Sequence, residues 1–143
     1  MPPTLFLGIM LALTAAAWLA QLLRRRSRRR TLRALAAQWK MHYAQADLFK
    51  LAGRIAPNFP IPGAAALCVC DLIYAAEGDK HRYIFTAEYT RGVTDPQHRE
   101  QRAATFCESK QPRSDHQTIC LAPYELTISK QYEFLHERAT QVR

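Results

Sequence analysis

The strongest feature of the hydrophobic pattern is an apolar stretch near the N-terminus, Leu5–Leu23, which contains no charged residue. Its only polar side chains are those of Thr14 and Gln21. As an α-helix rising about 1.5 Å per residue, the stretch measures roughly 28 Å, close to the thickness of the hydrocarbon layer of a bilayer. We therefore predict a transmembrane helix at residues 5–23, preceded by a short external N-terminus at residues 1–4.

The predicted span runs directly into an arginine cluster at residues 24–30. Its members are Arg24, Arg25, Arg26, Arg28, Arg29 and Arg30. Because moving these charges across a bilayer is unfavourable, they should stay on the cytoplasmic side of the span. We expect residues 31–143 to form one small cytoplasmic domain of a single-pass protein of the cell (plasma) membrane. The same arginines are candidates for contact with anionic lipid head groups.

A cleaved signal peptide is the main alternative explanation of the apolar stretch. Ala15–Ala17 would offer a cleavage site of small residues. However, residues 1–4 carry no positive charge, the apolar run is long, and the arginines lie on the wrong side of it. These features favour a membrane anchor.

Beyond the arginines, apolar residues recur at helical spacing from Leu32, which predicts a helix through about His42. Neither glycine nor proline separates this helix from the membrane span. Asp47 is placed to cap a second, short helix, which must end by Pro57 because proline cannot continue it.

The next segments alternate in the manner of β-strands. Ala64–Ala76 is an apolar, strand-like run, and His81–Arg91 alternates between apolar and polar residues after a turn. We predict a β-hairpin with one buried face, which carries Phe85, whereas Thr86 points to the other face. Its four apolar positions are Tyr83, Phe85, Ala87 and Tyr89.

Two shorter strands are expected at Arg102–Ser109 and His116–Ala122, and Pro123 stops the second. Ile128 begins a pattern typical of a closing amphipathic helix. The predicted fold class is therefore α+β. It consists of an N-terminal transmembrane helix and a small antiparallel β-sheet of about four strands, packed with two or three helices.

The formal net charge of +8 belongs mostly to the arginine cluster. Without its six arginines, 14 Lys and Arg face 12 Asp and Glu, a difference of +2. A nucleic-acid-binding domain usually concentrates basic residues on its folded surface. We therefore do not expect nucleic acid to be a partner of the domain.

The four cysteines are weak candidates for a metal or redox site: Cys68, Cys70, Cys107 and Cys120. The first two form a C-x-C pair on a predicted strand, which differs from the C-x-x-C spacing of zinc knuckles. Thiols in the cytoplasm are reduced by default. We expect all four to pack as small apolar residues, without a bound metal.

Asp71 is the unusual residue of the apolar strand, where alternation places it opposite the cysteines. Glu88 could share its face and form a carboxylate pair with it. The sequence contains no phosphate-binding glycine loop, no G-x-S-x-G and no H-E-x-x-H. We therefore predict no catalytic residue and no cofactor, and expect the protein not to be an enzyme.

One series of residues follows a recognisable order: Leu35-Ala36, Trp39, Tyr43, Asp47-Leu48, Pro60, Gly63, Asp71 to Tyr74 and Tyr83 to Thr90. It resembles a pattern in small, uncharacterised bacterial single-pass membrane proteins. That pattern is a membrane helix followed by a second helix, an aspartate, a loop and two long strands. The matching positions are hydrophobic and structural, so the resemblance implies no activity.

Three functions follow from these observations. The leading hypothesis is a membrane-anchored, non-enzymatic module that binds or scaffolds an unknown protein partner at the inner face of the membrane. The second is a thiol or metal sensor that uses the four cysteines. In the third, the arginine cluster itself tethers anionic lipid or nucleic acid as the main function.

Overall fold

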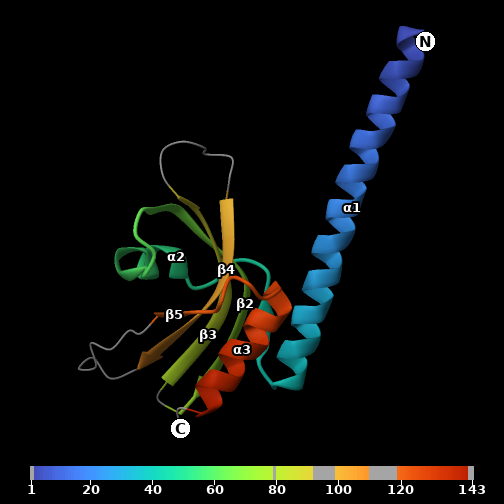
Figure 1. Cartoon of the computed structure of the whole chain (residues 1–143). Helices are drawn as coiled ribbons and strands as arrows, with labels where there is room; N and C mark the ends of the chain where they lie inside the picture. Colours follow the sequence, from blue (N-terminus) through green and yellow to red (C-terminus); the bar gives the residue numbers. More distant parts are fainter. Residues whose placement is uncertain (1, 79, 92–98, 110–118, 142–143) are drawn as a thin grey trace.

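The computed structural model describes residues 2–78, 80–91, 99–109 and 119–141, and it has the predicted α+β architecture (Figure 1). In chain order, the elements are α1 (Pro3–Gln38), β1 (His42–Ala44), α2 (Leu51–Ile55), the 3-10 turn η1 (Ala56–Asn58), β2 (Ala64–Glu77), β3 (Lys80–Arg91), β4 (Arg99–Ser109), β5 (Ile119–Leu121) and α3 (Ile128–Gln141). The five strands of the described residues form one antiparallel sheet in the order β1-β2-β3-β4-β5.

Helix α1 is one unbroken helix of 36 residues that contains the apolar stretch and the whole arginine cluster. In the described part of the chain, it is the one helix long and apolar enough to cross a membrane. Its N-terminal half extends away from the sheet, whereas its C-terminal part packs against it (Figure 1). The helix ends at Gln38 rather than at His42, because Lys40 adopts a left-handed backbone conformation (φ 57°) and the chain turns into β1.

Both faces of the sheet are covered, so the prediction of a single buried face for His81–Arg91 is wrong. Phe85 and Ile84 point to opposite faces, and each is fully buried. The core under α2 contains Leu51, Ile55, Ile61, Val69, Leu72, Tyr83, Phe85, Ala87, Tyr89, Ala104 and Phe106. The core under α1 and α3 contains Leu32, Leu35, Ala36, Ile73, Ile84, Ala103, Ala122, Tyr132 and Leu135.

The helix α2 forms where Asp47 was expected to cap it. The Asp47 carboxylate accepts hydrogen bonds from the backbone N–H groups of Leu51 (2.8 Å) and Ala52 (3.0 Å). These donors have no partner within the helix, and a carboxylate near a helix N-terminus also interacts favourably with the positive end of the helix dipole. The helix ends at Ile55, before Pro57, as predicted.

Strand β2 is irregular at two places. Its pairing with β3 shifts between Ala65 and Cys68 and again between Cys70 and Ile73. A residue with a left-handed backbone lies within each shift, Ala66 (φ 51°) in the first and Asp71 (φ 51°) in the second. Such β-bulges bend a strand and change the direction of a side chain. The second bulge positions the site described next.

Candidate functional site

The contact between α1 and the sheet contains an ion pair that no sequence motif predicts. The Arg28 guanidinium lies 3.3 Å from Oδ2 of Asp71, whose side chain is only 3% exposed. The other carboxylate oxygen, Oδ1, accepts a hydrogen bond of 2.7 Å from the Tyr43 hydroxyl. Burial and this hydrogen bond raise the pKa of Tyr43 well above its usual value, so the hydroxyl remains a donor to Asp71 even at alkaline pH.

The bulge explains why Asp71 points toward α1. Cys70 pairs with Thr86, and the next pair is Ile73 with Ile84. Two residues of β2, Asp71 and Leu72, are therefore opposite the single residue Phe85 of β3. Leu72 packs in the core under α2, and Asp71 turns to the opposite face. The Cys70 thiol also lies on the α1 face, near Glu88. The expectation that Asp71 and Cys70 project from opposite faces of the strand is therefore wrong. Strict alternation holds only for a regular strand.

A buried tyrosine ties the same bulge to α3. The Tyr132 hydroxyl donates to the backbone carbonyl of Asp71 at 2.7 Å and lies 2.7 Å from the Thr86 hydroxyl, which can donate to it. Both side chains are completely buried. Burial is the main cause that raises the pKa of Tyr132 well above its usual value. Helices α1 and α3 are thus both bonded to one distorted point of β2.

Asp71 and Glu88 do not form the direct carboxylate pair considered from the sequence. They are joined through Arg28, which donates to the Gln101 side chain (3.0 Å), and Gln101 in turn donates to Glu88 (2.8 Å). The Cys70 thiol donates to this group, 3.7 Å from the Glu88 carboxylate. Burial, followed by the charges of Glu88 and Asp71, raises the pKa of Cys70 to about 12. A thiol with this pKa is a poor nucleophile at neutral pH.

The arginine cluster divides into two groups. Arg28 and Arg29 are half-buried against the domain, whereas the others are exposed: Arg24, Arg25, Arg26 and Arg30. The Gln45 amide, oriented to satisfy its neighbours, accepts hydrogen bonds from both terminal nitrogens of Arg29 (2.8 and 3.2 Å). Only the exposed group is free to meet a surface outside the domain. The sequence gives no signal for this division, because the six residues are chemically identical.

The cysteines are all unpaired thiols. Cys68 is exposed, and Cys70, Cys107 and Cys120 are half-buried, so the expectation that they pack as core residues is wrong for Cys68. Cys107 lies opposite Arg82, and Cys120 lies opposite Thr105. Among the described residues, no three His, Cys, Asp or Glu side chains are grouped to hold a metal ion.

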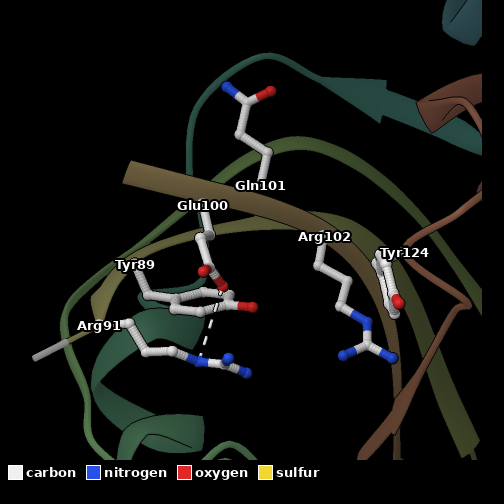
Figure 2. Close-up of a pocket in the computed structure, with 6 residues that line it drawn as sticks. All are labelled: Tyr89, Arg91, Glu100, Gln101, Arg102 and Tyr124. Atoms are coloured by element: carbon white, nitrogen blue, oxygen red, sulfur yellow. Dashed lines mark ion pairs between the residues drawn. The ribbon is translucent and has the colours of Figure 1, made fainter. Parts of the chain in front are cut away.

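An open pocket of about 560 Å³ lies at one end of the sheet. We call it the arginine pocket, and its walls are Tyr89, Arg91, Glu100, Gln101, Arg102 and Tyr124 (Figure 2). Figure 2 shows the side chains of Arg91, Glu100 and Arg102 pointing into the same space, whereas Gln101 points away from it. Sequence reasoning missed this pocket, although its strand residues alternate. Its composition becomes visible only once the register of β3 and β4 is known.

A second surface, at the opposite end of the sheet, is aromatic. The Phe49 ring lies 5.0 Å from the Tyr74 ring and 5.5 Å from the Tyr83 ring, measured between centroids. The His42 ring lies 5.3 Å from the Tyr74 ring. The neighbouring Leu48 is 60% exposed and Phe49 is 39% exposed. We call Leu48, Phe49, Tyr74 and His42 the aromatic surface.

The comparisons with known proteins provide no identification. No protein-family model matches the chain, and no curated protein or solved structure matches it either.

Proposed function

We propose that the chain is a non-enzymatic module anchored in the cell membrane by α1, and that its α+β domain binds another protein at the inner face of that membrane. The single observation that carries this proposal is the continuity of α1. One helix contains the exposed apolar stretch and then supplies Leu32, Leu35 and Ala36 to a core of the domain. A flexible linker would leave the domain free to rotate, whereas this helix fixes it relative to the bilayer.

Further contacts make the connection stiff. The Trp39 ring at the end of α1 stacks on His136 of α3, with centroids 4.0 Å apart and the rings 3° from parallel. The Arg28–Asp71 pair and the Arg29–Gln45 contact add polar bonds nearer the apolar stretch. A domain held in this way presents the same surface to the cytoplasm in every copy. That property suits scaffolding or partner binding.

The aromatic surface is where we place the partner. It lies at the end of the sheet farther from the apolar stretch. Helix α1 runs from that stretch to Gln38, and the chain then reaches His42, which belongs to the aromatic surface. Aromatic residues are enriched in protein interfaces, where a rigid ring buries a large area at a small cost in conformational entropy. Exposed Leu48 and Phe49 next to half-buried Tyr74 fit this description.

The thiol-sensor alternative receives less support from the geometry. A reactive cysteine needs a low pKa and an electropositive environment. Instead, the pKa of Cys70 is raised, and two carboxylates, Glu88 and Asp71, contribute to the increase. The exposed Cys68 lies opposite Glu88 on β3.

Site-specific crosslinking in the native membrane tests the protein-binding proposal. A photoreactive amino acid at Leu48 should give one discrete crosslinked species, whereas the same group at Lys130, which is exposed on α3, should give none. Phe49→Ala should abolish the species obtained at Leu48. Identical results at Leu48 and Lys130 would overturn the proposal. A species with twice the mass of the chain would identify a second copy as the partner.

A further inference from the structure

The arginine pocket lies at the end of the sheet that faces the apolar stretch. Arg28 of α1 is hydrogen-bonded to Gln101 near the start of β4, and Leu35, two turns later, packs in the same core as Ala103. Moving along α1 toward its N-terminus therefore means moving toward the start of β4 and the end of β3. Figure 1 shows the same relationship, because that end of the sheet points the same way as the N-terminal half of α1.

The helix also sets the depth of the pocket. Arg28 lies five residues after Leu23, the end of the apolar stretch, which is about 8 Å along an α-helix. The head-group layer on each side of the hydrocarbon core is roughly 5–8 Å thick. When the apolar stretch occupies the hydrocarbon core, Gln101 therefore lies at the outer edge of this layer. Glu100 and Arg102 flank Gln101 and line the pocket.

The pocket has the chemistry of an anion site. Nε of Arg102 donates to the backbone carbonyl of Ala122 at 2.6 Å, which orients the guanidinium. Its two terminal nitrogens have no hydrogen bond to any residue that the structure describes, and in Figure 2 they project into the pocket. Arg91 forms an exposed ion pair of 3.8 Å with Glu100. Two guanidinium groups against one carboxylate leave the pocket with an excess of positive charge.

We propose that the arginine pocket binds the phosphate group of an anionic phospholipid from the leaflet next to the domain. A guanidinium donates two parallel hydrogen bonds to phosphate oxygens, and Arg102 has both terminal nitrogens available for them. The Tyr124 side chain, 76% exposed, lies beside it and offers a hydroxyl donor. The open side of the pocket leaves room for the rest of the head group. This proposal adds a folded lipid site to the contact of the exposed arginines on α1, and it depends on the anchoring proposed above.

Native mass spectrometry of the full chain in detergent tests the pocket directly. The chain is delipidated and then offered phosphatidylglycerol or phosphatidylcholine, and the bound lipid is counted. We expect several-fold more phosphatidylglycerol on the native chain. Arg102→Gln should reduce its affinity about ten-fold, because one charge-assisted interaction is lost. Arg138→Gln is the matched control, since it removes the same charge from an exposed position on α3, outside the pocket and outside the arginine cluster.

The outcomes separate the sources of binding. Equal losses from Arg102→Gln and Arg138→Gln would mean that general charge, not the pocket, holds the lipid, and would overturn the proposal. Competition by inorganic phosphate as strong as that by the lipid would also overturn it, because the site would then be one for free phosphate. Arg102→Lys keeps the positive charge and should retain part of the binding. Retained binding would show that a change at this position does not abolish binding by unfolding the domain. Extraction of native membranes at alkaline pH tests the anchor separately, since a released chain would contradict the anchoring and not only the pocket.

Discussion

Arg28 of α1 and Asp71 of β2 are 43 residues apart in the sequence and form an ion pair of 3.3 Å. The pair joins the first part of α1 that contacts the domain to a bulge in the sheet. Asp71 is almost completely buried, whereas the Arg28 side chain is 26% exposed. A residue that the sequence assigns to the lipid boundary thus forms part of the folded domain. This contact links the direction of α1 to the structure of the sheet.

Removing this charge pair should destabilise the domain. We predict that Asp71→Asn lowers the free energy of unfolding by about 2 kcal/mol, because Arg28 is left half-buried without its partner. Asparagine tolerates the left-handed backbone of this position, so the substitution tests the charge rather than the strain. Urea titration of the full chain in detergent, followed by circular dichroism, measures the change. Glu125→Gln at an exposed position should change the free energy by less than about 0.5 kcal/mol.

The buried hydroxyl of Tyr132 should also contribute to stability. We predict that Tyr132→Phe lowers the free energy of unfolding by about 1–2 kcal/mol, because the Asp71 carbonyl and the Thr86 hydroxyl lose a shared partner. Phe85→Ala should cost about 3–5 kcal/mol, since it leaves a cavity at a fully buried position. The same urea titration provides both values. A result for Tyr132→Phe as small as that for Glu125→Gln would show that the hydroxyl network is not stabilising.

The regular elements of the fold could be predicted because local patterns determine them. The β2–β3 hairpin, β4 and α3 follow from the period of their apolar residues, and α2 from Asp47. The strand β1 was missed because three residues carry no period. Two-sided burial of β3 was missed because Thr86, a polar residue, suggested an exposed face. Its hydroxyl finds a partner only when α3 folds over the sheet.

The candidate sites were harder to predict because they depend on tertiary structure. Asp71 stands out in the sequence as an acid within an apolar strand, but the predicted direction of its side chain is wrong because one bulge reverses the alternation. The selection of Arg28 from six arginines depends on the rotation of α1 against the sheet. The arginine pocket joins residues of two strands and of the segment after β5, including Tyr124, and no local pattern connects them.

The stability of the domain should decrease at alkaline pH. The pKa of Cys70 rises from 9.0 to about 12 in the folded chain, and burial raises the pKa of Tyr43 and Tyr132 as well. Above pH 9 the unfolded chain therefore releases protons that the folded chain retains, which favours unfolding. We predict that the free energy of unfolding falls as the pH rises from 9 to 12. Below pH 9 these three groups are protonated in both states and make no pH-dependent contribution. Urea titrations across this range measure the slope, and Cys70→Ala should make it shallower.

The same pKa predicts an order of thiol reactivity. At pH 8, Cys68 should react with iodoacetamide much faster than Cys70, because Cys68 is exposed and the thiolate fraction of Cys70 is roughly a thousand-fold below that of an ordinary thiol. Peptide mass spectrometry after timed alkylation of the folded chain gives the two rates. Alkylation in urea is the control, since it should remove the difference. Faster reaction of Cys70 than of Cys68 would instead support the thiol-sensor hypothesis.

The exposed arginines of α1 should determine the orientation of the anchor without contributing to the fold. We predict that a reporter fused after Arg143 lies in the cytoplasm, and that replacing the four exposed arginines with glutamine produces a mixture of orientations. The substitutions are Arg24→Gln, Arg25→Gln, Arg26→Gln and Arg30→Gln, which spare the arginines bonded to Asp71 and Gln45.

Paired fusions to alkaline phosphatase, active only after export, and to green fluorescent protein measure the orientation of both chains. The matched control removes four exposed charges from the region after the cluster: Lys40→Gln, Lys50→Gln, Lys130→Gln and Arg138→Gln. This control should keep the native orientation, because charges close to the end of a span determine topology most strongly. A native chain whose phosphatase fusion is active and whose fluorescent fusion is dark would place the domain outside. The aromatic surface and the arginine pocket would then both lie on the external side of the membrane.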